Sequence, residues 1–179
     1  MKELGKDKAA TKSEPATENG VELPKEVICA FGEVPYEVFR ERYADVYKQI
    51  HDMDHLLFGR ITYTGKLGPK EFQMRTLKQQ ERALIASVIP AQNTDTFTRD
   101  MMLYEVYKVV LSLKAFGEVK LSPTAISLEE PLSVWVEKNK ATIDTVMDFD
   151  ETLTRHLSNI YEDISQAKQY AFMEILPNP

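Results

Sequence analysis

The sequence predicts a mainly α-helical protein with one small β-hairpin, a long C-terminal helical segment and a flexible N-terminal tail. Apolar residues recur at spacings of three and four over most of the chain after Pro35, as expected for amphipathic helices. Gly65, Gly68 and Pro69 separate two short strand-like runs, a pattern typical of a hairpin. A chain of 179 residues, of which 43% are hydrophobic, can bury one ordinary core, so we expect one domain with a tail.

Composition narrows the classes of function. The 28 acidic residues outnumber the 22 basic ones and give a net charge of −6, which argues against a broad nucleic-acid-binding surface. The single Cys29 cannot form an internal disulfide and favours a reducing, cytoplasmic location. The sequence has no apolar run of about eighteen residues and no apolar leader, so neither a membrane-spanning helix nor a signal peptide is expected.

The N-terminal part divides into a tail and the start of the domain. Residues 1–24 are small, charged and polar, which predicts a flexible tail, and residues 25–179 are the predicted domain. The apolar run Val27–Phe31 is long enough for one strand. An amphipathic stripe then predicts a helix over Pro35–Phe58, because proline suits the first turn of a helix.

A hairpin and a polar helix are predicted next. The strands of the hairpin are Arg60–Tyr63 and Glu71–Arg75. Thr76 is a good N-cap, and Gln79 completes a capping box three residues later. The helix that begins there is predicted to end at Pro90.

The central core helix is predicted from Thr94 or Asp95 to Phe116, because this stretch is apolar around much of its circumference. Gly117 is its predicted C-cap. The residues that follow, 118–130, are predicted to form an extended linker.

Segment 131–172 carries an apolar heptad seam, in which only Asn139 and Asp150 are polar. The seam residues are Leu132, Val136, Asn139, Ile143, Val146, Asp150, Leu153, Leu157, Ile160, Ile164, Ala167 and Ala171. The lack of glycine and proline favours one long, bent helix, and a kink near Asp148 that lets Asp150 cap a second helix is the alternative. The seam must face either the central helix or another chain. Its predicted interaction residues are Leu153, Leu157, Ile160 and Ile164.

The run Asp148-Phe149-Asp150-Glu151-Thr152-Leu153 resembles the first motif of the haloacid dehalogenase superfamily. The resemblance implies a nucleophilic Asp148, an acid–base Asp150 and a nearby Mg²⁺. That motif needs a buried parallel strand and later motifs, for which too few residues follow, and Glu151 stands where the superfamily commonly has glycine. We therefore predict a capping box formed by Asp148 and Glu151, and no catalytic residue.

A second motif, His51-Asp52-Met53-Asp54-His55, places two histidines four residues apart on a predicted helix, a spacing that can hold a metal ion. The His-Asp doublet resembles the HD-domain phosphohydrolases. That family needs an earlier histidine, and none precedes His51. A polar helix end is therefore predicted, with no metal and no cofactor. A metal-dependent phosphohydrolase using His51, Asp52 and His55, or the aspartates of the previous motif, is the alternative function.

A modest basic patch is formed by Lys66, Lys70, Arg75, Lys78 and Arg82. Such a patch either contacts an acidic partner or is an ordinary solvated surface. Arg75, Lys78 and Arg82 are accordingly the predicted basic interaction residues.

The stretch Phe72–Ser87, a strand followed by Arg-Thr-Leu and a polar helix, resembles a pattern in small bacteriophage tail-assembly and baseplate-assembly proteins. The resemblance implies a non-catalytic assembly protein, such as a tail assembly chaperone, in the host cytoplasm or the virion. The leading hypothesis is therefore a non-enzymatic interaction protein. Its expected partners are other proteins, including phage tail components or copies of itself, and neither a membrane nor a nucleic acid.

Overall fold

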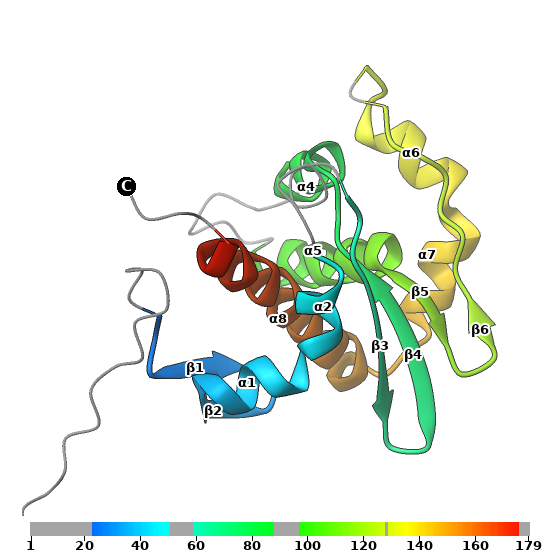
Figure 1. Ribbon diagram of the computed structural model, residues 1–179. Coiled ribbons are helices and arrows are strands. Elements are labelled where there is room, and N and C mark those ends of the chain that lie inside the picture. The colour runs from blue at the N-terminus through cyan, green and yellow to red at the C-terminus, as the bar shows by residue number, and fades with distance from the viewer. Residues whose placement is uncertain (1–22, 51–58, 88–96, 128, 176–179) are drawn as a thin grey trace, which may run out of the picture.

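The computed structural model of the chain describes residues 23–50, 59–87, 97–127 and 129–175 (Figure 1). These residues form seven helices and six strands, and none of these helices is long and apolar enough to cross a membrane. The predicted tail lies almost entirely outside the described residues. In chain order the elements are β1 (Glu26–Cys29), β2 (Gly32–Pro35), α1 (Tyr36–Arg42), α2 (Ala44–Lys48), β3 (Thr62–Leu67), β4 (Lys70–Arg75), α4 (Gln79–Ala86), α5 (Phe97–Ser112), β5 (Leu113–Phe116), β6 (Val119–Lys120), α6 (Leu132–Lys138), α7 (Lys140–Met147) and α8 (Glu151–Ile175).

The strands form two antiparallel sheets, so the fold is mixed α/β and the prediction of a mainly α protein with one hairpin is wrong. One sheet consists of β1 and β2, and the other has the order β3-β4-β5-β6. The predicted hairpin is present as β3 and β4, but it is half of the larger sheet. β5 replaces the predicted end of the central helix, and β6 lies in the predicted linker.

Strand β5 depends on a pairing that is distant in the sequence. Leu113 and Phe116 are buried, and so short a stretch, with Lys114 between its apolar ends, suits either a helix end or a strand. Phe72 of β4 lies opposite Phe116, so the sheet decides between the two. Gly117 therefore turns the chain between β5 and β6 instead of capping a helix. It has a φ of 57° and donates its N–H to the carbonyl oxygen of Glu71 at 2.7 Å.

The N-terminal elements differ from the prediction in two places. Where one strand was expected, β1 and β2 form a hairpin, and Gly32, the first residue of β2 after the turn, has a φ of 100°. The predicted helix from Pro35 is divided at Tyr43 into α1 and α2, and its last part, 51–58, lies outside the described residues. Both α2 and β1 contact α8, and α8 also packs against α5.

Gly65 lies within β3, although the sequence pattern placed it in the loop of the hairpin. The turn occurs at Gly68, which has a φ of 59°. A methyl group at position 65 would come within 2.6 Å of Cζ of Phe72 and 2.9 Å of Cε1 of Tyr63. The missing side chain therefore allows the buried Phe72 ring to lie across the strand.

Gly65→Ala is expected to lower the free energy of unfolding by about 1–3 kcal/mol, because overpacking displaces the Phe72 ring. Urea denaturation measures this change. Lys66→Ala is the matched control on the same strand, since its exposed side chain should contribute less than about 0.5 kcal/mol. Equal stability of the Gly65→Ala variant and the native protein would contradict this account of the hairpin.

Helix α4 begins later than predicted. Thr76 Oγ1 accepts the N–H of Ile61 at 3.0 Å, so the hydroxyl is engaged with the strand and does not cap the helix. Lys78 is the N-cap, and the carboxylate of Glu81 accepts its N–H at 2.7 Å. The strand-then-helix pattern of Phe72–Ser87 is thus present as β4 and α4.

The C-terminal seam is divided among α6, α7 and α8, so the favoured prediction of one long helix is wrong and the alternative with a kink near Asp148 is correct. The carboxylate of Asp150 is exposed and accepts the N–H of Thr152 at 2.8 Å. A carboxylate is costly in an apolar core unless it is compensated, and capping α8 in contact with water provides that compensation. Asp150 therefore caps α8, in place of the predicted box of Asp148 and Glu151.

Asn139 marks the other break, between α6 and α7, and it is buried. Its side-chain amide donates to the carbonyl oxygen of Trp135 at 2.8 Å and to the hydroxyl of Thr124 at 2.7 Å. Its oxygen accepts the N–H of Thr124 at 2.7 Å. The polar seam residue is therefore satisfied by the segment that leads into α6.

The seam faces the inside of the protein. Leu157, Ile160 and Ile164 are buried in the core, and Leu153 is partly buried against it. Helix α8 packs along α5 (Figure 1), which answers the question whether the seam faces the central helix or another chain. These four predicted interaction residues are thus engaged within the fold.

Candidate functional site

A pocket of about 730 Å³ lies where the start of β3, the N-terminal end of α4 and the C-terminal half of α8 meet. We call it the basic pocket, for the charge described below. Its lining residues are Gly59, Arg60, Leu77, Lys78, Gln79, Gln80, Arg82, Ser165, Lys168, Gln169 and Phe172. Three separate segments of the sequence therefore build one site.

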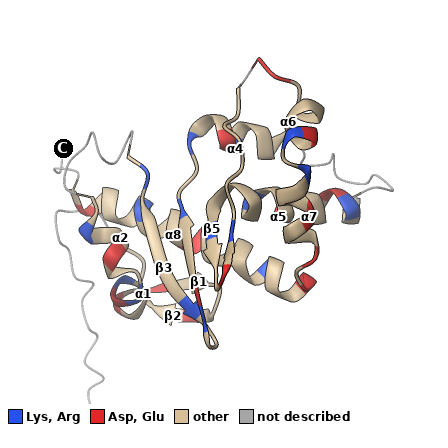
Figure 2. Ribbon diagram, turned by 90° about the vertical axis from the view of Figure 1, so that its right-hand side faces the viewer, with Lys and Arg blue, Asp and Glu red and all other residues tan. Residues whose placement is uncertain are grey.

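Among the described residues that line the pocket, four side chains are cationic and none is acidic. They are Arg60 before β3, Lys78 and Arg82 at α4, and Lys168 on α8. Elsewhere, basic and acidic positions are interspersed along the ribbon (Figure 2), and the whole chain has a net charge of −6. The basic pocket is thus a local excess of positive charge on an acidic protein.

Glu81 lies behind the pocket and holds two of the arginines in place. Its buried carboxylate accepts from Arg60 Nη2 at 2.8 Å and from Arg75 Nη2 at 3.4 Å. Burial, and then the positive charge of Arg60, lower the pKa of Arg75, whose Nε donates to the carbonyl oxygen of Leu111 at 3.1 Å. One carboxylate faces two guanidinium groups, so the cluster still carries a net positive charge.

Two polar groups of the pocket residues are buried without a hydrogen-bond partner among the described residues. They are Nη1 of Arg60 and Oγ of Ser165. Ser165 as a whole is only 9% exposed. A buried polar group without a partner costs about 1–3 kcal/mol. A ligand oxygen that accepts from both groups would recover part of this cost.

The environment of Lys168 also favours binding of an anion. Its Nζ donates to the carbonyl oxygen of Gly59 at 3.3 Å. Burial, followed by the positive charge of Arg82, lowers the pKa of Lys168 below its usual range. An anion in the basic pocket would oppose this lowering of the pKa, because a nearby negative charge favours the protonated amine.

The pocket has the donors needed for binding but lacks an activated nucleophile in the arrangement seen. Ser165 and Lys168 are three residues apart on α8, a spacing that could form a serine–lysine pair. Oγ of Ser165 has no hydrogen-bond partner in the described part of the chain, while Nζ of Lys168 donates to Gly59. Activation of the serine requires a hydrogen bond to its base, and that bond is not formed here.

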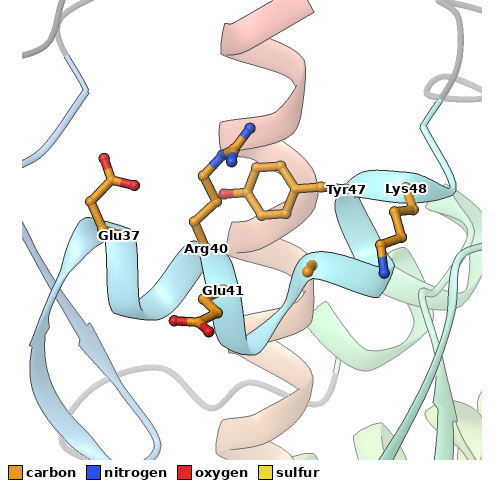
Figure 3. Close-up of a pocket in the computed structure, with 6 residues that line it drawn as sticks. Glu37, Arg40, Glu41, Tyr47 and Lys48 are labelled. Atoms are coloured by element: carbon orange, nitrogen blue, oxygen red, sulfur yellow. The ribbon is translucent and has the colours of Figure 1, made fainter.

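A second depression, of about 570 Å³, lies on α1 and α2 (Figure 3) and is lined by Glu37, Arg40, Glu41, Ala44, Tyr47 and Lys48. It has two acidic and two basic side chains, so it has no excess of either charge. Arg40 is already paired with Glu174 at 3.0 Å, and Figure 3 shows Glu37, Glu41 and Lys48 pointing in different directions. The basic pocket is therefore the better candidate for a binding site.

The sequence predicted part of the basic pocket. Lys78 and Arg82 line the pocket. Arg75 lies behind it and forms an ion pair with Glu81. The two other residues of the predicted patch, Lys66 and Lys70, are on the β3–β4 hairpin and do not line the pocket. Arg60, Ser165 and Lys168 were missed, since only the tertiary fold brings them to α4.

The two motifs that suggested phosphohydrolases are not joined into a site by the described residues. Asp150 caps α8, and Asp148 is the exposed C-cap of α7. His51, Asp52 and His55 lie outside the described residues. Among the residues that are described, no group of three or more His, Cys, Asp or Glu side chains is placed to hold a metal ion.

Comparisons with protein-family models, curated proteins and solved structures found no match to this chain.

Proposed function

We propose that the protein is a non-enzymatic interaction protein that holds an acidic segment of a partner protein in the basic pocket. The observation that carries this proposal is the set of four cations, with no carboxylate, among the described residues that line the pocket. Because the whole chain has a net charge of −6, a negatively charged partner is repelled by the protein at long range and attracted by the local positive charge of the basic pocket. Charge complementarity of this kind fixes the orientation of a partner and speeds its association.

The proposed role in assembly is supported by where the resemblance to phage tail-assembly and baseplate-assembly proteins falls. The stretch Phe72–Ser87 contains the last part of β4 and all of α4, and α4 with its N-cap brings Arg82 and Lys78 to the pocket. A tail or baseplate component with an exposed acidic segment, present in the host cytoplasm before the virion is complete, is the partner class that we propose.

Neutralising two pocket cations is expected to weaken binding of an acidic partner. The double variant Lys78→Gln, Arg82→Gln should bind a fluorescein-labelled glutamate-rich peptide about tenfold more weakly, because each ion pair near a surface contributes up to about 1 kcal/mol. Fluorescence anisotropy at two salt concentrations measures this change, and native binding should weaken as salt rises.

The matched control is Lys66→Gln, Lys70→Gln, which removes the same charge from the β3–β4 hairpin. Its affinity for the peptide should stay within about twofold of the native protein, since the Debye length is only about 10 Å at 0.1 M salt. Equal weakening in the two double variants would mean that only net charge matters, and the proposed function would be wrong.

A further inference from the structure

We infer that the group seated at the base of the basic pocket is a phosphomonoester on a side chain of the partner's acidic segment. This inference rests on the proposed function, because it names the chemistry of the anion that the same pocket receives. A phosphorylated side chain carries about −1.5 to −2 charges and three acceptor oxygens. Glutamate and aspartate offer one charge and two oxygens.

The first reason is the number of donors that have no partner. Arg60 Nη1 and Ser165 Oγ are buried and have no hydrogen-bond partner within the described part of the chain. Gln79 and Gln80, the first two residues of α4, line the same pocket, and the first N–H groups of a helix have no partner within the helix. These donors come from the segment before β3, from α4 and from α8, so they belong to three separate parts of the chain. Three terminal oxygens can accept from more of them than two can.

The second reason is charge. Glu81 offsets part of the charge on Arg60. Among the described residues, Lys78, Arg82 and Lys168 form no ion pair. One carboxylate would offset one of these three cations, whereas a phosphomonoester offsets nearly two. The more highly charged group accordingly offsets more of the lowering of the Lys168 pKa that burial and the charge of Arg82 cause.

The third reason is the size and lining of the pocket. Its volume of about 730 Å³ exceeds what a free phosphate ion fills, and Leu77 and Phe172 supply apolar wall. An apolar wall can pack against the carbon atoms of a side chain, whereas an inorganic phosphate ion has no apolar surface to bury there. The geometry therefore favours a phosphate carried on a peptide over free phosphate.

The experiment uses the full chain and three labelled peptides of one acidic sequence, with serine, glutamate or phosphoserine at the central position. Fluorescence anisotropy measures each affinity, and inorganic phosphate is added as a competitor. The phosphoserine peptide is expected to bind about tenfold more tightly than the glutamate peptide. Inorganic phosphate should compete only at a concentration at least about a hundredfold above that of the phosphoserine peptide.

Ser165→Ala is expected to reduce the preference for phosphoserine over glutamate to about twofold, because it removes one of the two buried donors. Thermal unfolding shows whether the variant is folded, and a folded protein is expected since Oγ of Ser165 has no partner to lose among the described residues. Lys66→Gln is the control outside the pocket and should keep the full preference.

Each outcome separates this inference from the function on which it rests. Equal binding of the glutamate and phosphoserine peptides would overturn the phosphomonoester while leaving the acidic partner in place. Competition by inorganic phosphate at the affinity of the phosphopeptide would show that free phosphate is the ligand, and it would also overturn the inference. If none of the peptides binds, both proposals are wrong.

Discussion

Leu157→Ala is expected to lower the free energy of unfolding by about 2–5 kcal/mol, the range for deleting a buried leucine side chain. Leu157 is 0% exposed and lies within the seam of α8 that faces α5. Truncation leaves a cavity between two long helices that are held apart by their other contacts, so little of the lost volume can be refilled. Urea denaturation of the purified protein measures the change.

Met173→Ala is the matched control, because this residue is on the same helix and is 38% exposed. It should change the free energy of unfolding by less than about 1 kcal/mol. Size-exclusion chromatography of the Leu157→Ala variant tests whether the seam also serves another chain. A small stability loss combined with a change of oligomeric state would place the seam at an interface and contradict its burial within the chain.

The seam shows which parts of the fold can be predicted from the sequence. Its spacing identified an inward-facing stripe correctly, because helical periodicity is a local property that survives in the tertiary structure. Ile143, Val146, Leu157, Ile160, Ile164, Ala167 and Ala171 are all buried. The same spacing gave the wrong helix length, since a heptad pattern does not show where the chain turns. Asn139 and Asp150, the two polar residues of the seam, were the sequence signal for these turns, because both lie at a helix boundary.

The sheet and the pocket could not be predicted for a different reason. Leu113–Phe116 becomes a strand through its pairing with β4, and no local pattern specifies that partner. The basic pocket likewise joins Arg60, α4 and Lys168, which are far apart in the chain. Lys78 and Arg82 could be predicted as a basic patch because they are close together in the sequence. Arg60 and Lys168 could not, because they are distant from both in the sequence.

Asp163 is a buried carboxylate that connects α8 to the N-terminal elements. It is 3% exposed, and it accepts the N–H of Ala30 at 3.0 Å and the hydroxyl of Tyr43 at 2.7 Å. Ala30 lies in the β1–β2 turn, and Tyr43 lies between α1 and α2. One side chain thus holds two separate parts of the N-terminal region against the core.

Asp163→Ala is expected to lower the free energy of unfolding by roughly 2–5 kcal/mol. It leaves the N–H of Ala30 and the hydroxyl of Tyr43 without their acceptor, and each such donor costs about 1–3 kcal/mol when buried. Asp163→Asn keeps one acceptor oxygen at this position and should lose less. Urea denaturation of both variants at one pH compares them. Equal losses would mean that the volume of the side chain matters and its hydrogen bonds do not.

The same carboxylate should also make stability depend on pH. Burial raises the pKa of Asp163 above its usual value, while the hydrogen bonds from Tyr43 and Ala30 and the charges of Arg42 and His156 act in the opposite direction. The folded state therefore binds a proton more readily here than the unfolded state does. The contribution of Asp163 to stability is fully present below a pH of about 3.9, the usual aspartate pKa, and is lost as pH rises through the folded-state value.

Asp163→Asn removes this titration, so the difference in unfolding free energy between the native protein and the variant isolates it from the other carboxylates. As pH rises from about 4 towards 7, the native protein should lose stability relative to the Asp163→Asn variant. Urea denaturation at several pH values measures the difference, and Asp144→Asn, an exposed residue of α7, is the control that should show no such trend. A difference that stays constant or moves the other way would show that the hydrogen bonds from Tyr43 and Ala30 outweigh the desolvation of the carboxylate, and that Asp163 holds the N-terminal elements best when it is charged.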